Sequence, residues 1–204
     1  ETEAVRQLIA HVASVELDDG LRFDVATATA ESIREGEQYA GVRVRLEAAL
    51  ATARQVFHVD VNVGDPVVPR ARVTALPRLL EEGTIELHAY PLTMVVAEKL
   101  MTTLERGTTN TRWRDFADLY LILRRHSLHH TELLEALREV ARFRAVEIVP
   151  LGDALAGYAP LAQPKWAVWR RKQGMEAQLP GEFAEVVGSL AAACDPTLRE
   201  AARE

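Results

Sequence analysis

A lysine at position 99 lies where a helix facing a protein core would carry an apolar residue. In the segment 91–106, Leu92, Val96, Lys99 and Thr103 recur at helical spacing and share one stripe of the predicted helix. A buried ammonium is costly unless an anion pairs with it. Lys99 therefore either forms a structural ion pair with a carboxylate or binds an anionic ligand such as a phosphate, and this segment leaves both alternatives open.

Two aspartates lie near the start of the next predicted helix, over 111–126. Asp115 and Asp118 are three residues apart, so their carboxylates lie on the same side of the helix. Asp115 also shares its stripe with Leu119 and Ile122, which turns it towards the core. Carboxylates in an early helical turn gain from the helix dipole. The pair has either this ordinary stabilising role or a role in binding a lysine or a nucleotide.

Asp60 interrupts an otherwise apolar strand predicted over 56–63. The valines on either side of it fall on the opposite face, so Asp60 shares its face with His58 and Asn62. Such a polar row is typical of a solvated sheet face. It also suits a strand-borne carboxylate beside an active site, because Mg²⁺ prefers oxygen ligands.

The order of these residues resembles the AbiEii/AbiGii toxin family. The resemblance is carried by the runs VDVNVGD at 59–65, VAEKL at 96–100 and RDFADLY at 114–120, and it extends from about Asp18 to the C-terminal helices. That family is similar to polymerase-beta-like nucleotidyltransferases, and its members act as the toxin of a two-gene toxin–antitoxin pair. Some transfer nucleotides from NTP onto the acceptor end of tRNA. The resemblance implies an α+β fold, a polymerase-beta-like mixed sheet with a helical C-terminal lobe.

The same resemblance implies roles for individual residues. Lys99 and Asp115 would be catalytic, with Lys99 binding the triphosphate and Asp115 orienting Lys99 or the nucleophile. Lys99 and Asp118 would bind the nucleotide, and Asp60 would be the metal ligand. The expected cofactor is Mg²⁺, the substrate is NTP, and the partners are a cognate antitoxin protein and tRNA or another RNA. Nucleotidyl transfer needs charge neutralisation on the phosphates and activation of a hydroxyl, which such residues supply.

One motif of the family has no counterpart in the sequence. A Gly-Ser turn followed by an Asp-x-Asp strand is expected before the first helix, and neither precedes it here. We therefore expect that the motif lies upstream of Glu1, or that the chain is a catalytically degenerate member that keeps the fold and binds a partner such as the antitoxin. A third alternative is a helical adaptor in which Lys99 only pairs with Asp115 or Asp118.

Strand patterns come first along the chain and helical patterns follow, which indicates an α+β domain with a helical C-terminal lobe. Asp18-Asp19-Gly20 is typical of a turn into a strand. We expect residues 1–90 to form the remainder of a nucleotidyltransferase α/β core and 91–204 to complete the site and form the lobe. Strands are predicted at 21–25, 42–46, 56–63 and 84–88, and helices near 2–15, 91–106, 111–126, 131–145, 164–173 and 180–193.

The composition favours a cytoplasmic protein. The net charge of the 204 residues is -6, so contact with RNA needs a local basic patch. A single cysteine, Cys194, excludes an internal disulfide and makes a zinc site a poor hypothesis. No apolar run is long enough to span a bilayer, so we expect no membrane contact.

Two groups of basic residues are candidates for such a patch. One is the Trp166 and Trp169 pair on a basic helix, which suits either RNA contact or a core anchor. The other lies at the end of the Asp115 helix and just after it and suits phosphate or metal, although a helix C-terminus favours cations in any case. Its members are Arg124, Arg125, His126, His129 and His130.

Overall fold

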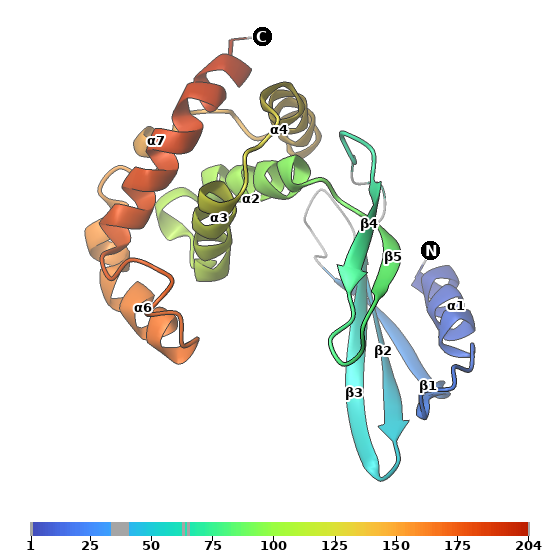
Figure 1. Cartoon of the computed structure of the whole chain (residues 1–204). Coiled ribbons are helices and arrows are strands. Elements are labelled where there is room, and N and C mark those ends of the chain that lie inside the picture. Colours follow the sequence, from blue (N-terminus) through green and yellow to red (C-terminus); the bar gives the residue numbers. More distant parts are fainter. Residues whose placement is uncertain (1, 34–40, 63, 65, 204) are drawn as a thin grey trace. The chain divides into compact units, whose positions relative to one another are not determined.

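The chain divides into two compact units, residues 1–65 and 66–204, in a computed structural model that describes residues 2–33, 41–62, 64 and 66–203 (Figure 1). An antiparallel sheet precedes a helical region, which confirms the expected α+β class. The boundary after residue 65 separates two units that each pack internally. The predicted division at residue 90, between the nucleotidyltransferase core and the part that completes the site, stays a prediction.

The first unit is a helix against a three-stranded antiparallel sheet. Helix α1 (Thr2–Ala13) packs on strands β1 (Leu21–Ile33) and β2 (Gly41–Leu50), and β3 (Ala53–Asn62) pairs with β2 on the other side. The strand predicted at 56–63 is therefore confirmed over 56–62 and starts a little earlier, and residue 63 lies outside the described residues.

The alternation predicted for β2 is also confirmed. Val42, Val44 and Leu46 are buried against apolar residues of α1, whereas Arg45 between them is exposed. A period of two residues places successive side chains on opposite faces. Burial of the valine and leucine face is what holds α1 on the sheet.

The predicted turn before β1 is present. The Leu21 N–H donates to Asp19 Oδ1 at 2.9 Å, and Gly20 adopts a φ of +74°. That φ lies in the left-handed region, which glycine enters without the steric cost that a Cβ would bring. Asp19 thus acts as a turn former.

The second unit starts with a hairpin, β4 (Arg72–Pro77) and β5 (Thr84–Ala89), before the helices. The pattern at 84–88 predicted β5. Strand β4 was missed, because all six of its residues are exposed, Pro69 precedes it and Pro77 is its last residue. Proline removes a backbone donor and argues against a strand from sequence alone.

The helical region is built around one apolar core. In it, α2 contacts α3 and α4, and α7 contacts α3, α4, α5 and α6. None of the helices in the described part of the chain is long and apolar enough to cross a membrane. The helices are α2 (Leu92–Arg106), α3 (Trp113–Arg125), α4 (His130–Arg144), α5 (Leu151–Ala154), α6 (Tyr158–Lys172) and α7 (Phe183–Ala201), with a 3₁₀ turn at Gly107–Thr109.

The predicted ends of two helices were wrong, and each of these helices contains a proline. Helix α6 already begins at Tyr158 rather than at Pro164, and α7 continues past Pro196 to Ala201. A proline in a helix interior costs about 3 kcal/mol. Burial of the large side chains on these helices offsets that cost, since Trp166 and Phe183 are fully buried.

Candidate active site

Helix α2 fixes the position of Lys99. Pro91 precedes the first turn with a φ of −57°, which suits a helix start. Val96, Leu100 and Thr103 are buried on α2 and anchor it in the core. Lys99 lies between them, and its side chain keeps only 20% of its exposure. The helix therefore holds the ammonium at the margin of the core.

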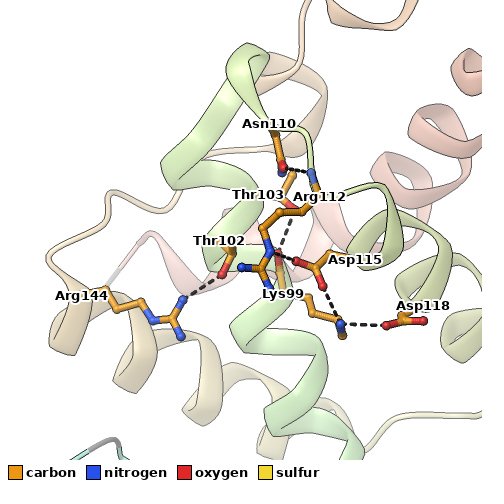
Figure 2. A network of polar contacts seen from close by, with 8 residues as sticks. All are labelled: Lys99, Thr102, Thr103, Asn110, Arg112, Asp115, Asp118 and Arg144. Atoms are coloured by element: carbon orange, nitrogen blue, oxygen red, sulfur yellow. Dashed lines mark hydrogen bonds and ion pairs between the residues drawn. The ribbon is translucent and has the colours of Figure 1, made fainter. Parts of the chain in front are cut away.

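Helix α3 supplies the two carboxylates that meet this ammonium. Phe116 and Leu119 are fully buried and set the rotation of α3. Lys99 Nζ donates to Asp115 Oδ1 at 2.7 Å and to Asp118 Oδ2 at 2.9 Å (Figure 2). The three residues singled out on the two helices are thus brought together in one cluster.

Arg112 completes the cluster and was not among the predicted site residues. Its Nε donates to Asp115 Oδ2, so both oxygens of Asp115 are engaged. The Arg112 N–H donates to Asn110 Oδ1 at 2.8 Å, which fixes the start of α3 (Figure 2). The spacing of three residues between Arg112 and Asp115 was the available signal.

Burial and hydrogen bonding act in opposite directions on this cluster. Burial by itself lowers the pKa of Lys99, but the hydrogen bonds to Asp115 and Asp118 outweigh it, and the pKa lies above its usual value. Burial raises the pKa of Asp115, but the hydrogen bonds from Lys99 and Arg112 outweigh this too, and the pKa lies below its usual value. Both groups are therefore charged at neutral pH.

The charge state limits what the cluster can do. A lysine with a raised pKa does not act as a general base near pH 7, whereas it neutralises phosphate charge well. An ammonium has three N–H donors, and two of those on Lys99 go to Asp115 and Asp118. Among the described residues, the third N–H of Lys99 is thus left for an incoming anion.

A second cation lies one turn further along α2. Arg144 reaches across from α4, and its Nη1 donates to Thr102 Oγ1 at 2.9 Å (Figure 2). The guanidinium stays charged at any physiological pH. The Arg144 guanidinium thus adds positive charge beside Thr102, one helical turn after Lys99 on α2.

Asp60 lies in the first unit, whereas the Lys99 cluster belongs to the second. It faces Arg43 across β2 and β3, and the guanidinium donates to its two oxygens at 2.7 and 2.8 Å. A metal ion at Asp60 would have to displace or share that pairing. The role of Asp60 as a metal ligand stays a prediction.

The described residues do not form a metal site by themselves. Among them, no group of three or more His, Cys, Asp or Glu side chains is placed to hold an ion. Asp115 and Asp118 already accept hydrogen bonds from Lys99. Mg²⁺ favours octahedral oxygen coordination, so the donor set near Lys99 does not fit it.

The other sequence candidates are distributed differently. Trp166 is fully buried, stacks on Trp169 at 5.4 Å and donates from Nε1 to Pro180 O, so it is a core anchor. In the predicted basic cluster, Arg124 donates to the Tyr120 hydroxyl and His130 pairs with Glu200. The remaining members of that cluster, Arg125, His126 and His129, line an open pocket between the end of α3 and the start of α4.

Comparison with known proteins identifies the family. No curated protein and no solved structure gives a significant match. A family model described as "Nucleotidyl transferase AbiEii toxin, Type IV TA system" matches residues 1–201, nearly the whole chain. The family description implies an NTP substrate and an antitoxin partner. The chain belongs to the AbiEii nucleotidyltransferase toxin family of type IV toxin–antitoxin systems.

Proposed function

We propose that this protein transfers a nucleoside monophosphate from NTP to an RNA acceptor, with the 3′ end of tRNA as the expected acceptor. In this reaction the acceptor hydroxyl attacks the α-phosphorus, and pyrophosphate leaves. One observation supports the proposal above all. Lys99 is held by Asp115 and Asp118 with a donor to spare, in a chain of the matching family.

In the proposed site, Lys99 binds the triphosphate. Its charge offsets the phosphate oxygens, and its fixed position means that little reorganisation is needed when the substrate arrives. Asp115 orients Lys99 and not the nucleophile, because its side chain is only 6% exposed and its two oxygens face Lys99 and Arg112. Asp118 is more exposed, with 38% of its side-chain surface accessible, and would accept hydrogen bonds from nucleotide hydroxyls.

Magnesium belongs to the proposal as the counterion that accompanies NTP. It would need carboxylates beyond the Lys99 cluster, and Asp60 remains the candidate from the sequence. When bound, it would neutralise phosphate charge alongside Lys99. The proposed roles of Lys99, Asp115 and Asp118 do not depend on it.

A second function is supported by one observation. The described residues contain no group of three or more His, Cys, Asp or Glu side chains that could hold a metal ion. This second function is that of a catalytically degenerate protein that keeps the fold and binds the antitoxin. In that case the Lys99 cluster is a structural ion-pair network, and no nucleotide is transferred.

Label transfer distinguishes the two functions. The native-length protein is incubated with Mg²⁺, total tRNA and each α-labelled NTP in turn. We expect label on tRNA with the native protein and none with Lys99→Ala. Lys172→Ala is the matched control, because Lys172 is an exposed lysine at the end of α6.

The outcomes assign the function directly. Label that survives in Lys172→Ala but not in Lys99→Ala supports the transferase. A folded native protein that labels no RNA with any NTP supports the degenerate, partner-binding alternative. Equal label in Lys99→Ala would remove Lys99 from the site.

A further inference from the structure

A small pocket lies beside the turn that joins α2 to α3. Its volume is about 170 Å³, and its walls come from that turn, from the first residue of α3 and from α6. Its lining includes Thr108, Thr109, Thr111, Trp113, Leu161 and Lys165. The proposed roles of Lys99, Asp115 and Asp118 use none of these residues.

The pocket shares a wall with the Lys99 cluster. That wall is Asn110, which lines the pocket and is fully buried. Its Oδ1 accepts the Arg112 N–H at 2.8 Å, and the Arg112 guanidinium in turn binds Asp115 (Figure 2). The Asn110 carbonyl accepts a hydrogen bond from the hydroxyl of Tyr158, another lining residue. The pocket therefore adjoins the cluster at Arg112.

Trp113 gives the pocket a rigid apolar wall. Its ring stacks on Tyr158 with an interplanar angle of 9° and meets Phe183 edge-on, so it has little freedom to move. Leu161 lines the pocket from α6 and is 74% exposed. Exposed apolar surface gains when a ligand covers it. The flat face of a nucleobase suits such walls, because every base has a π-face that packs on aromatic side chains.

The polar groups of the pocket suit the edge of a base. The lining threonines carry hydroxyls, which both donate and accept hydrogen bonds. The edges of nucleobases likewise present donors and acceptors. Lys165 adds positive charge, and no carboxylate is among the described residues that line the pocket, although the net charge of the chain is -6. Such local positive charge favours a ligand that carries phosphate.

The size of the pocket limits the ligand to one ring system. Pockets that enclose drug-sized ligands have volumes of about 300–1,000 Å³, whereas this one has about 170 Å³. A base fits inside it, and the rest of a nucleotide must lie outside. The segment 106–114, which contributes most of the lining, carries three arginines and no acidic residue. The surroundings of the pocket thus suit the phosphates of that nucleotide.

We propose that this pocket binds a nucleobase of a substrate, packed against Trp113 and Leu161 with its polar edge on the threonine hydroxyls. The base belongs either to the NTP or to the terminal nucleotide of the RNA acceptor, and the chemistry of binding is the same for both. The assignment to a substrate rests on the proposed function. The binding of a base rests on the lining of the pocket alone.

The indole N–H signals of the tryptophans test the site. The full chain is labelled at its three tryptophans and titrated with each NTP, with a short single-stranded RNA and with inorganic tripolyphosphate. We expect a saturable shift of the Trp113 signal with an NTP or with the RNA, and none with tripolyphosphate. Trp166 is the internal reference, because it is fully buried and its indole N–H donates to Pro180 O. No saturable shift with NTP or RNA, or an equal shift with tripolyphosphate, would overturn the proposal.

A carboxylate at the pocket provides a matched pair of variants. Leu161→Glu places it in the lining, where it repels a ligand that carries phosphate, and should weaken the affinity measured at Trp113 at least fivefold. Val168→Glu places the same charge on the same helix outside the lining and should leave this affinity unchanged. Both native side chains are exposed, so the fold is kept. An unchanged affinity in Leu161→Glu would contradict the assigned site.

The choice of ligand identifies the source of the base. A shift of the Trp113 signal with NTP alone assigns the pocket to the incoming nucleotide, and a shift with RNA alone assigns it to the acceptor. Both results support a base pocket.

Lys99→Met separates this proposal from the proposed function. Transfer is expected to be lost in this variant, yet RNA or a nucleoside monophosphate should still shift the Trp113 signal. A native protein that labels no RNA but shows the shift would lose the proposed function and keep the base pocket. If no ligand shifts the signal in folded Lys99→Met, the pocket does not bind a base by itself, and the proposal is wrong.

Discussion

Replacement of Asp115 with asparagine removes the central charge of the Lys99 cluster and preserves its size. Asp115 is only 4% exposed and bridges Lys99 and Arg112. The amide offers one acceptor where the carboxylate offers two, so a donor then faces another donor. Removal of one partner of a fully buried pair costs about 3–5 kcal/mol. Lys99 keeps Asp118, so we expect a smaller loss of about 2–3 kcal/mol in the free energy of unfolding.

The loss should depend on pH in a defined direction. The pKa of Asp115 in the folded protein lies below its unfolded value, because hydrogen bonds from Lys99 and Arg112 outweigh burial. A depressed pKa contributes stability that is present above the unfolded value of about 4 and lost as the pH falls through the folded value. The difference between native protein and Asp115→Asn should therefore be full at pH 7 and shrink below about pH 4.

Urea unfolding at pH 7 and pH 3 measures both effects. Asp18→Asn, a change at an exposed turn, is the matched control and should be neutral at pH 7. A variant as stable as the native protein at pH 7 would refute the assigned pairing. So would a stability difference that does not shrink at pH 3.

Three further predictions concern the helical unit. Asp195→Ala should lower the free energy of unfolding by about 1–2 kcal/mol, measured with urea. The Asp195 carboxylate accepts a hydrogen bond from the Leu151 N–H at 2.7 Å and so caps α5. An unchanged unfolding midpoint would contradict this prediction. Phe116→Ala should cost about 3–5 kcal/mol in the same assay, and a loss below 1 kcal/mol would show that the ring is not in the core. Burial raises the pKa of Cys194 to about 12. Because the thiolate is the reactive form, iodoacetamide at pH 8 should modify this thiol only after unfolding.

The sequence predicted most elements because their periodicity is strong. Val42, Val44 and Leu46 alternate cleanly, and burial of that face in the structure confirms the strand. Element ends were predicted less well. Pro164 was taken as a helix start although α6 begins at Tyr158, and the last helix was predicted to end at Ala193 although α7 continues through Pro196 to Ala201.

The Lys99 cluster was predictable in part. Lys99 and Asp115 each stood out as a charge on an apolar stripe, and Asp118 stood out by its spacing of three residues from Asp115. Pairing is the main way to keep such charges near a core. Arg112 did not stand out, because its side chain is half exposed and lies before the helix. Asp60 belongs to the other compact unit, and local periodicity carries no information on how a chain divides into units.

Nucleotide affinity measures the central claim that Lys99, positioned by Asp115 and Asp118, binds the triphosphate. Calorimetry compares each NTP with its monophosphate for the native protein, Lys99→Met and the control Lys172→Met. The account predicts that the native protein and Lys172→Met bind one or more NTPs at least tenfold more tightly than the monophosphate, and that Lys99→Met loses this preference. A folded Lys99→Met that binds NTP as tightly as the native protein would contradict it.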